Sequence, residues 1–160
     1  MTTTSTMALA SPRTVTRRAT LFMAGGLWVL AALQPAGAQA APLTAADEKQ
    51  VRTVIEAQLK AFARDDAKKA YTYAAPNVKA AMGSADAFLA MVRRDYPVVY
   101  RPASVAFLKP EGEGDQAIQR VQMTDAGGTA WLAVYSLARQ KDKSWRITGC
   151  AVVENRARTA

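Results

Sequence analysis

The chain has 160 residues, half of them hydrophobic, which is enough for one folded domain and a targeting segment. It contains no histidine and a single cysteine, which excludes imidazole catalysis, histidine-ligated zinc and an internal disulfide. The formal net charge is +8, but three of the basic residues lie in residues 1–40, which hold no acidic residue. The rest is mildly basic without a lysine and arginine run, so we expect no nucleic-acid partner.

Residues 1–40 have the pattern of a secretory signal peptide. Three arginines precede an apolar run at 21–33, and small residues follow at Ala36, Ala38 and Ala40. We therefore expect cleavage after residue 38 or 40 and a periplasmic or secreted mature protein. The apolar run is too short to span a bilayer comfortably, so we expect no stable membrane anchor after cleavage. Adjacent arginines at 17 and 18 suggest twin-arginine export, but the residues after them match that signal poorly, which favours the general secretory route.

Three helices are predicted next. Thr44 and Asp47 fit a capping box, and the helix that they begin has one apolar stripe of Val51, Val54, Ile55, Leu59 and Phe62. A shorter helix is predicted over 67–75, limited by Pro76. Ser84 is a suitable N-cap for a third helix over 85–95, whose inward residues are predicted to be Phe88, Met91 and Val92.

The pattern becomes extended from Tyr96 onward. Strands are predicted within 98–108, interrupted by Pro102, and over 117–124 after a turn at 109–115. A tight connection at 125–128 then leads into a β-hairpin over 129–153, the most apolar part of the chain. Its first strand alternates two apolar sets, Trp131, Ala133, Tyr135 and Leu137 on one face and Leu132, Val134 and Ala138 on the other. We therefore predict one α+β domain over 41–154 and a flexible tail at 155–160.

Several short motifs give the chain a family resemblance that covers about residues 46–153. They are Val54-Ile55 with Gln58-Leu59 and Asp65-Asp66, Ala74-Ala75-Pro76, Met91-Val92 with Tyr96 to Pro102, and Trp145-Arg146-Ile147 with Gly149-Cys150. In these motifs the chain resembles the exported bacterial family called domain of unknown function 4864. The resemblance implies the nuclear-transport-factor-2-like fold, also called a cystatin-like cone. In that fold, three helices pack on a curved antiparallel sheet of about four strands. It implies no activity, because this fold hosts isomerases, dehydratases and binding domains alike.

Aromatic side chains are the candidates for a ligand cavity between the helices and the sheet. The predicted pocket-lining residues are Tyr71, Tyr73, Met91, Tyr100, Trp131, Tyr135 and Trp145. The alternative is that these residues simply form the core. For Trp131 we expect a structural role first.

Catalytic chemistry has few candidates. Asp95 could act as a general base, with Tyr100, Tyr135 and Arg120 stabilising an oxyanion. Arg93 and Arg94 precede Asp95, so a surface ion pair explains this carboxylate equally well. The Asp65-Asp66 pair fits helix capping better than a metal site. Cys150, expected on the same sheet face as Arg146 and Thr148, fits a buried small hydrophobe. We expect no metal and no cofactor.

The sequence therefore predicts non-catalytic binding of a small apolar ligand or of a protein partner in the cell envelope. A cofactor-free isomerase or lyase that uses Asp95 and tyrosine hydroxyls is one alternative. A structural homodimer that pairs through the exposed sheet face is another.

Overall fold

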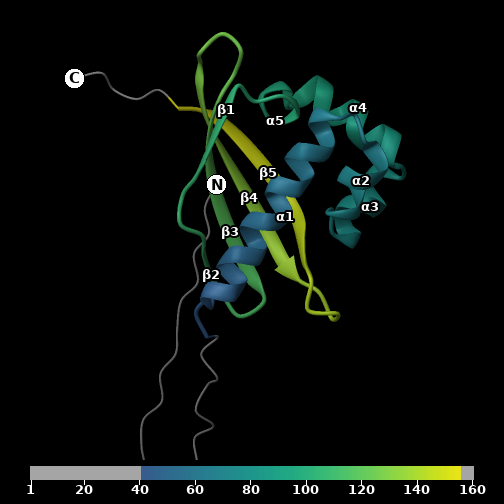
Figure 1. Ribbon diagram of the computed structural model, residues 1–160. Helices are drawn as coiled ribbons and strands as arrows, with labels where there is room; N and C mark the ends of the chain where they lie inside the picture. The colour runs from purple at the N-terminus through teal and green to yellow at the C-terminus, as the bar shows by residue number, and fades with distance from the viewer. Residues whose placement is uncertain (1–40, 156–160) are drawn as a thin grey trace, which may run out of the picture. The chain divides into compact units, whose positions relative to one another are not determined.

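The computed structural model describes residues 41–155, and it contains five helices and five strands in that range (Figure 1). The predicted signal peptide and residues 156–160 of the predicted tail lie outside the described residues. All five helices precede the strands, as expected for an α+β chain. Within 41–155, no helix combines the length and apolar character needed to cross a membrane.

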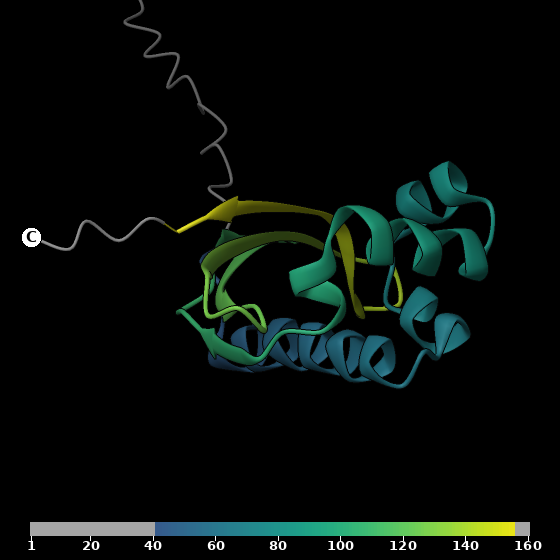
Figure 2. The ribbon, with the colours of Figure 1, turned by 90° about the horizontal axis from the view of Figure 1, so that it is seen from above.

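Helix α1, Ala45–Ala63, begins at the predicted capping box. The backbone N–H of Asp47 donates to the Thr44 hydroxyl oxygen at 3.2 Å, and the Thr44 N–H donates to the Asp47 carboxylate at 3.3 Å. The stripe prediction is confirmed, because its members are buried apart from Val54, which is half-buried. The helix therefore lies with this stripe against the sheet, along one side of it in Figure 2.

The prediction of a second helix over 67–75 is wrong in its length, because the observed helix is shorter. Helix α2 covers only Ala67–Thr72, and Pro76 begins a further helix, α3, Pro76–Met82. A proline fits the first helical position because its missing N–H would have had no partner there. The residues between the two helices pair with the last strand instead: Ile147 N–H donates to Tyr73 O at 2.9 Å, and Ala75 N–H donates to Ile147 O at 2.8 Å.

Helix α4, Ala85–Asp95, has the predicted bounds, and the Ser84 hydroxyl accepts from Ala87 N–H at 3.1 Å. The extended segment predicted directly after Tyr96 is wrong, because Pro97–Tyr100 forms a short helical turn, α5. Val98 and Val99 of this turn are buried in the core. A pair of β-branched residues favours strand locally, but here their burial under α1 and α4 decides the conformation.

The sheet is antiparallel, in the order β1-β3-β4-β5 with the short β2 also on β3. The bounds are Ser104–Phe107 for β1, Glu111–Glu113 for β2, Gln116–Thr124 for β3, Ala130–Arg139 for β4 and Trp145–Glu154 for β5. The predicted hairpin and the strand at 117–124 are confirmed, whereas β2 lies in the segment predicted as a turn. Figure 2 shows the curved sheet with the helices on its concave side.

The two faces of β4 are as predicted, but those of β5 are not. Ala133, Tyr135 and Leu137 are buried on the concave face. On β5 the pairing shifts between Ser136 and Leu137, which leaves Thr148 as an extra residue in a β-bulge. Beyond the bulge Cys150 pairs with Tyr135 and lies on the concave face, so the prediction that it shares a face with Thr148 and Arg146 is wrong.

A buried carboxylate joins the first helix to the hairpin. Asp47 is 7% exposed and accepts hydrogen bonds from the Thr44 hydroxyl at 2.7 Å and from Trp145 Nε1 at 3.3 Å. Arg139 Nη2 lies 2.9 Å from the same carboxylate, and its guanidinium stacks 5.0 Å from the Trp145 ring centroid. The Thr44 hydroxyl first, and then Trp145 and the charge of Arg139, hold the pKa of Asp47 below its ordinary value.

We predict that Asp47→Asn destabilises the fold in a pH-dependent manner. A lowered folded-state pKa adds stability above the ordinary value of 3.8, and this stability is lost as pH falls through the folded pKa. The thermal midpoint of Asp47→Asn should therefore lie well below that of wild type at neutral pH, and the gap should narrow below pH 3.8. Asp86→Asn, at an exposed position in the first turn of α4, is the control and should behave as wild type. A gap that is the same at every pH would contradict the prediction.

Candidate functional site

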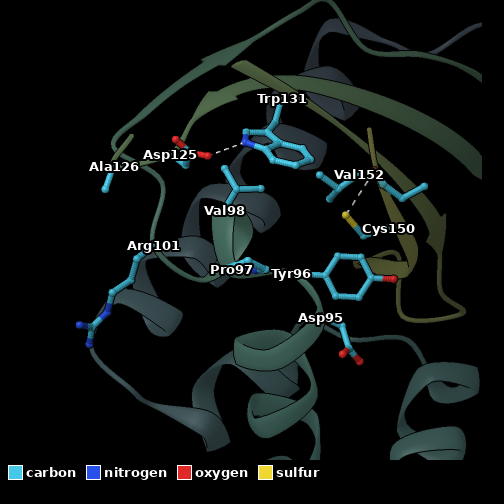
Figure 3. Close-up of a pocket in the computed structure, with 11 residues that line it drawn as sticks. Asp95, Tyr96, Pro97, Val98, Arg101, Asp125, Ala126, Trp131, Cys150 and Val152 are labelled. Carbon is cyan, nitrogen blue, oxygen red and sulfur yellow. Dashed lines mark hydrogen bonds between the residues drawn. The ribbon is translucent and has the colours of Figure 1, made fainter. Parts of the chain in front are cut away.

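Two hollows lie on either side of the α5 turn. We call the first the outer cleft; it measures about 660 Å³ and lies between α5 and the hairpin, with Trp131, Val98 and Val152 in its wall (Figure 3). We call the second the inner cavity; it measures about 220 Å³ and lies between α4 and the concave face of the sheet. Tyr96 and Cys150 line both hollows, so the two adjoin at these side chains. Together they form the candidate site.

The outer cleft has an indole wall that is fixed by a loop carboxylate. Trp131 Nε1 donates to Asp125 Oδ2 at 2.9 Å, and the other oxygen of Asp125 accepts from the N–H groups of Gly127 and Thr129, each at 2.9 Å. The Trp131 bond first, and then that of Thr129, lower the pKa of Asp125. This carboxylate is therefore engaged in holding the loop, and the half-buried indole lines the cleft (Figure 3).

The inner cavity is apolar and has no charged residue in its wall. Most of the lining is apolar and includes Phe62 of α1, Phe88 and Met91 of α4, Val99 of α5 and Ile147 of β5. This composition comes from the inward stripes of α1 and α4, which meet the sheet here without filling the space completely. The cavity suits apolar groups and disfavours charge.

Tyr135 is one of the few polar residues in this wall, together with Gln58 and Tyr96. Its side chain is 1% exposed, and its hydroxyl has no hydrogen-bond partner among residues 41–155. Burial first, and then the neighbouring Cys150 thiol, raise the pKa of Tyr135 well above its ordinary value. The phenol is therefore neutral and keeps its proton.

Cys150 stands at the junction of the two hollows, half-buried. Its sulfur lies 3.9 Å from the carbonyl oxygen of Ala151 (Figure 3), a long and weak contact. Burial raises the pKa of the Cys150 thiol to about 12, so at neutral pH it is a thiol and not a thiolate. This supports a packing and lining role over a nucleophilic one.

Asp95, Tyr100 and Tyr135 do not converge. Asp95 lines the outer cleft, where Arg94 holds its carboxylate with contacts of 2.7 and 2.8 Å and lowers its pKa. In Figure 3 this carboxylate points away from Trp131 and Cys150. Tyr135 lines the inner cavity, and Tyr100 instead donates to Asp65. The fourth candidate, Arg120, pairs with Glu111 at 2.6 Å.

Asp66 caps a helix, as predicted for the Asp65-Asp66 pair, whereas Asp65 has a different, bracing role. Asp66 accepts from Lys69 N–H at 2.9 Å at the start of α2. Asp65 accepts from Tyr100 and lies 2.6 Å from Arg93 and 3.0 Å from Arg101, so it ties the α1–α2 turn to α4 and α5. No cluster of three or more metal-ligating side chains occurs in the described part of the chain.

Three of the seven predicted lining residues line one of the two hollows. Met91 and Tyr135 line the inner cavity and Trp131 lines the outer cleft, but the other four lie elsewhere. The Tyr71 hydroxyl donates to Lys79 O at 2.8 Å, and Tyr73 lies under the Lys69 ammonium. Tyr100 belongs to the Asp65 cluster, and Trp145 is fully buried beside Asp47.

The comparisons with known proteins agree with this fold. The sequence profile described as a domain of unknown function (DUF4864) matches residues 44–160. The chain belongs to this family. No curated protein matches it.

Three solved structures resemble this DUF4864 domain. An NTF-2 like protein of unknown function from Silicibacter pomeroyi DSS-3 has 19% identity and a TM-score of 0.50, and the match covers 71% of this chain and 100% of that one. An NTF-2 like protein of unknown function from Burkholderia xenovorans LB400 has 16% identity and a TM-score of 0.47, covering 71% and 88%. A protein from Kribbella flavida DSM 17836 has 20% identity and a TM-score of 0.42, covering 66% and 86%. The likeness to the Silicibacter pomeroyi protein shows that the DUF4864 domain has the NTF2-like fold, and this similarity extends to fold alone.

Sequence reasoning missed the residues that divide the site. The sequence pattern predicts an extended segment at Tyr96 and Val98, whereas Tyr96 precedes the α5 turn and Val98 is part of it. The pattern indicates only a turn at Asp125, and simple alternation predicts the wrong face for Cys150. Pro97 was the available signal, because a proline after a helix end can also begin the next helical turn.

We predict that the two tryptophans of the hairpin differ in their contribution to stability. Trp145→Ala should cost about 3–5 kcal/mol, because Trp145 is 1% exposed and fully packed. Trp131→Ala should cost only about 1–2 kcal/mol, because part of the indole already faces the cleft. Urea denaturation of both variants, with Trp131→Phe as the mild control, measures the difference. Equal losses would place Trp131 in the packed core instead of the wall of a site.

Proposed function

We propose that this DUF4864 domain binds a small apolar molecule without changing it chemically. The apolar part of the ligand would occupy the inner cavity, and the rest would extend past Tyr96 and Cys150 into the outer cleft. The observation that carries this proposal is the uncharged, largely apolar wall of the inner cavity, which adjoins the outer cleft at these two residues. Most small-molecule sites have this character, with few polar groups in a largely hydrophobic lining.

The alternative, a cofactor-free isomerase or lyase, has less support. A general base needs a carboxylate that can reach the substrate and whose pKa suits proton uptake near neutral pH. Asp95 is paired with Arg94, which lowers its pKa, and it does not share a hollow with Tyr135. Binding without catalysis requires no such group and fits the uncharged inner cavity.

We predict that filling the junction of the two hollows blocks binding. Cys150→Phe places a ring where the inner cavity meets the outer cleft, so the affinity for the neutral fluorescent probe N-phenyl-1-naphthylamine should fall at least about tenfold. Val153→Phe is the matched control, because Val153 is on the same strand but is 53% exposed. Fluorescence titration measures both affinities, and a thermal melt confirms that both variants fold.

Probe binding that is unchanged in Cys150→Phe would contradict the proposal. Native mass spectrometry of protein purified from the cells that produce it adds a test with the natural ligand. It also reports whether the domain is a monomer or a dimer.

We further propose that the domain acts outside the cytoplasm, because of the signal-peptide pattern in residues 1–40. The mature protein is predicted to begin at Gln39 or Ala41. Intact mass spectrometry of the periplasmic fraction measures this start directly. A full-length mass in the membrane fraction would contradict it.

A further inference from the structure

The wall of the inner cavity includes Tyr135, whose hydroxyl is a hydrogen-bond donor that lacks an acceptor in the described part of the chain. The Tyr135 hydroxyl is buried, its side chain lines the cavity, and no group within residues 41–155 pairs with it. An unpaired buried hydroxyl costs free energy that a phenylalanine at the same position would not cost. A tyrosine here is therefore a local defect in stability, of the kind that binding sites carry.

The other polar groups near the cavity do not relieve this defect. Gln58 Nε2 donates to Ala70 O at 3.2 Å and braces α1 against α2, and Gln58 Oε1, the acceptor of that amide, makes no hydrogen bond with the Tyr135 hydroxyl. The Cys150 thiol interacts with the Tyr135 hydroxyl, but it makes no hydrogen bond of acceptable geometry with it, and a protonated sulfur is a weak acceptor. The phenol has one O–H proton to donate, so a ligand that satisfies this donor must present an acceptor.

Charge is disfavoured at the same place. No lysine or arginine lines the inner cavity, and burial raises the pKa values of both Tyr135 and Cys150. An anionic ligand would meet the same desolvation cost with no cation to offset it. The acceptor is therefore carried by an uncharged group.

We propose that the ligand is a small neutral molecule with a hydrogen-bond acceptor, such as a carbonyl oxygen, that accepts a hydrogen bond from the Tyr135 hydroxyl. This inference rests on the proposed binding function and narrows its ligand class. Because the hydroxyl is also closed to water, a lining side chain must rotate for the acceptor to reach it. Met91 and Cys150 line the same cavity, are half-buried, and can rotate without moving the backbone.

Three benzene derivatives of similar shape test the proposal. Acetophenone carries a neutral carbonyl, α-methylstyrene replaces its oxygen by a methylene group, and benzoate carries a negative charge. Acetophenone should bind the wild-type protein roughly threefold to tenfold more tightly than α-methylstyrene, the value of one net hydrogen bond. Benzoate should bind more weakly than either. Ligand-observed NMR titration measures all three affinities.

Tyr135→Phe should abolish the preference for acetophenone while α-methylstyrene binds as before. Its thermal midpoint should equal or exceed that of wild type, because the unpaired hydroxyl is gone. Tyr73→Phe, a tyrosine outside both hollows, is the matched control and should keep the preference.

The outcomes separate the two proposals. Equal affinities of acetophenone and α-methylstyrene for wild type, or a preference that survives in Tyr135→Phe, would overturn the Tyr135 inference and leave apolar binding standing. Benzoate binding as tightly as acetophenone would overturn the neutral ligand class. Failure of every compound to bind would overturn the inference together with the proposed function.

Discussion

The carboxylate of Asp47 fixes how the helical layer sits on the sheet. It closes the capping box of α1 and also contacts Trp145 and Arg139 of the hairpin, almost a hundred positions further along the chain. A buried carboxylate is tolerated only when it is hydrogen-bonded and paired, so its partners cannot separate cheaply. With the start of α1 held there, the far end of the helix delivers Gln58 and Phe62 to the inner cavity. The position of the cavity wall therefore depends on a contact at the opposite end of α1.

The bulge in β5 has an equally specific effect on the site. Because a strand alternates faces with every residue, one extra residue at Thr148 exchanges the faces for everything after it. Cys150 and Val152 consequently face the helices, next to Tyr135 and Ala133. Ser136 lies where a side chain at Gly149 would need room, since a Cβ there would be 3.1 Å from its hydroxyl oxygen. A glycine at this position lets the two strands stay close while the bulge redirects Cys150.

The sequence predicted those features that are encoded locally. The capping box at Thr44, the stripe of α1, the N-caps Asp66 and Ser84 and the faces of β4 each follow from the spacing of a few residues. The errors fall where distant contacts decide the conformation. Residues 73–75 pair with Ile147, Val98 and Val99 turn helical under burial, and the bulge changes the face of Cys150. The α5 turn and the β5 bulge border the candidate site. Aromatic lining residues could therefore be proposed from the sequence, but the division into an outer cleft and an inner cavity could not.

The pairing of residues 73–75 with β5 also affects how the protein behaves at high concentration. An edge strand presents unpaired backbone groups that can template the addition of another chain. Here Tyr73 and Ala75 occupy the backbone groups of Ile147, and Asn77 Nδ2 donates to the neighbouring Thr148 O at 3.0 Å. At the opposite edge Pro42 bridges to Glu113, and prolines at 102 and 110 flank β1. Both borders of the sheet are thus shielded over part of their length, which protects the domain against edge-to-edge aggregation.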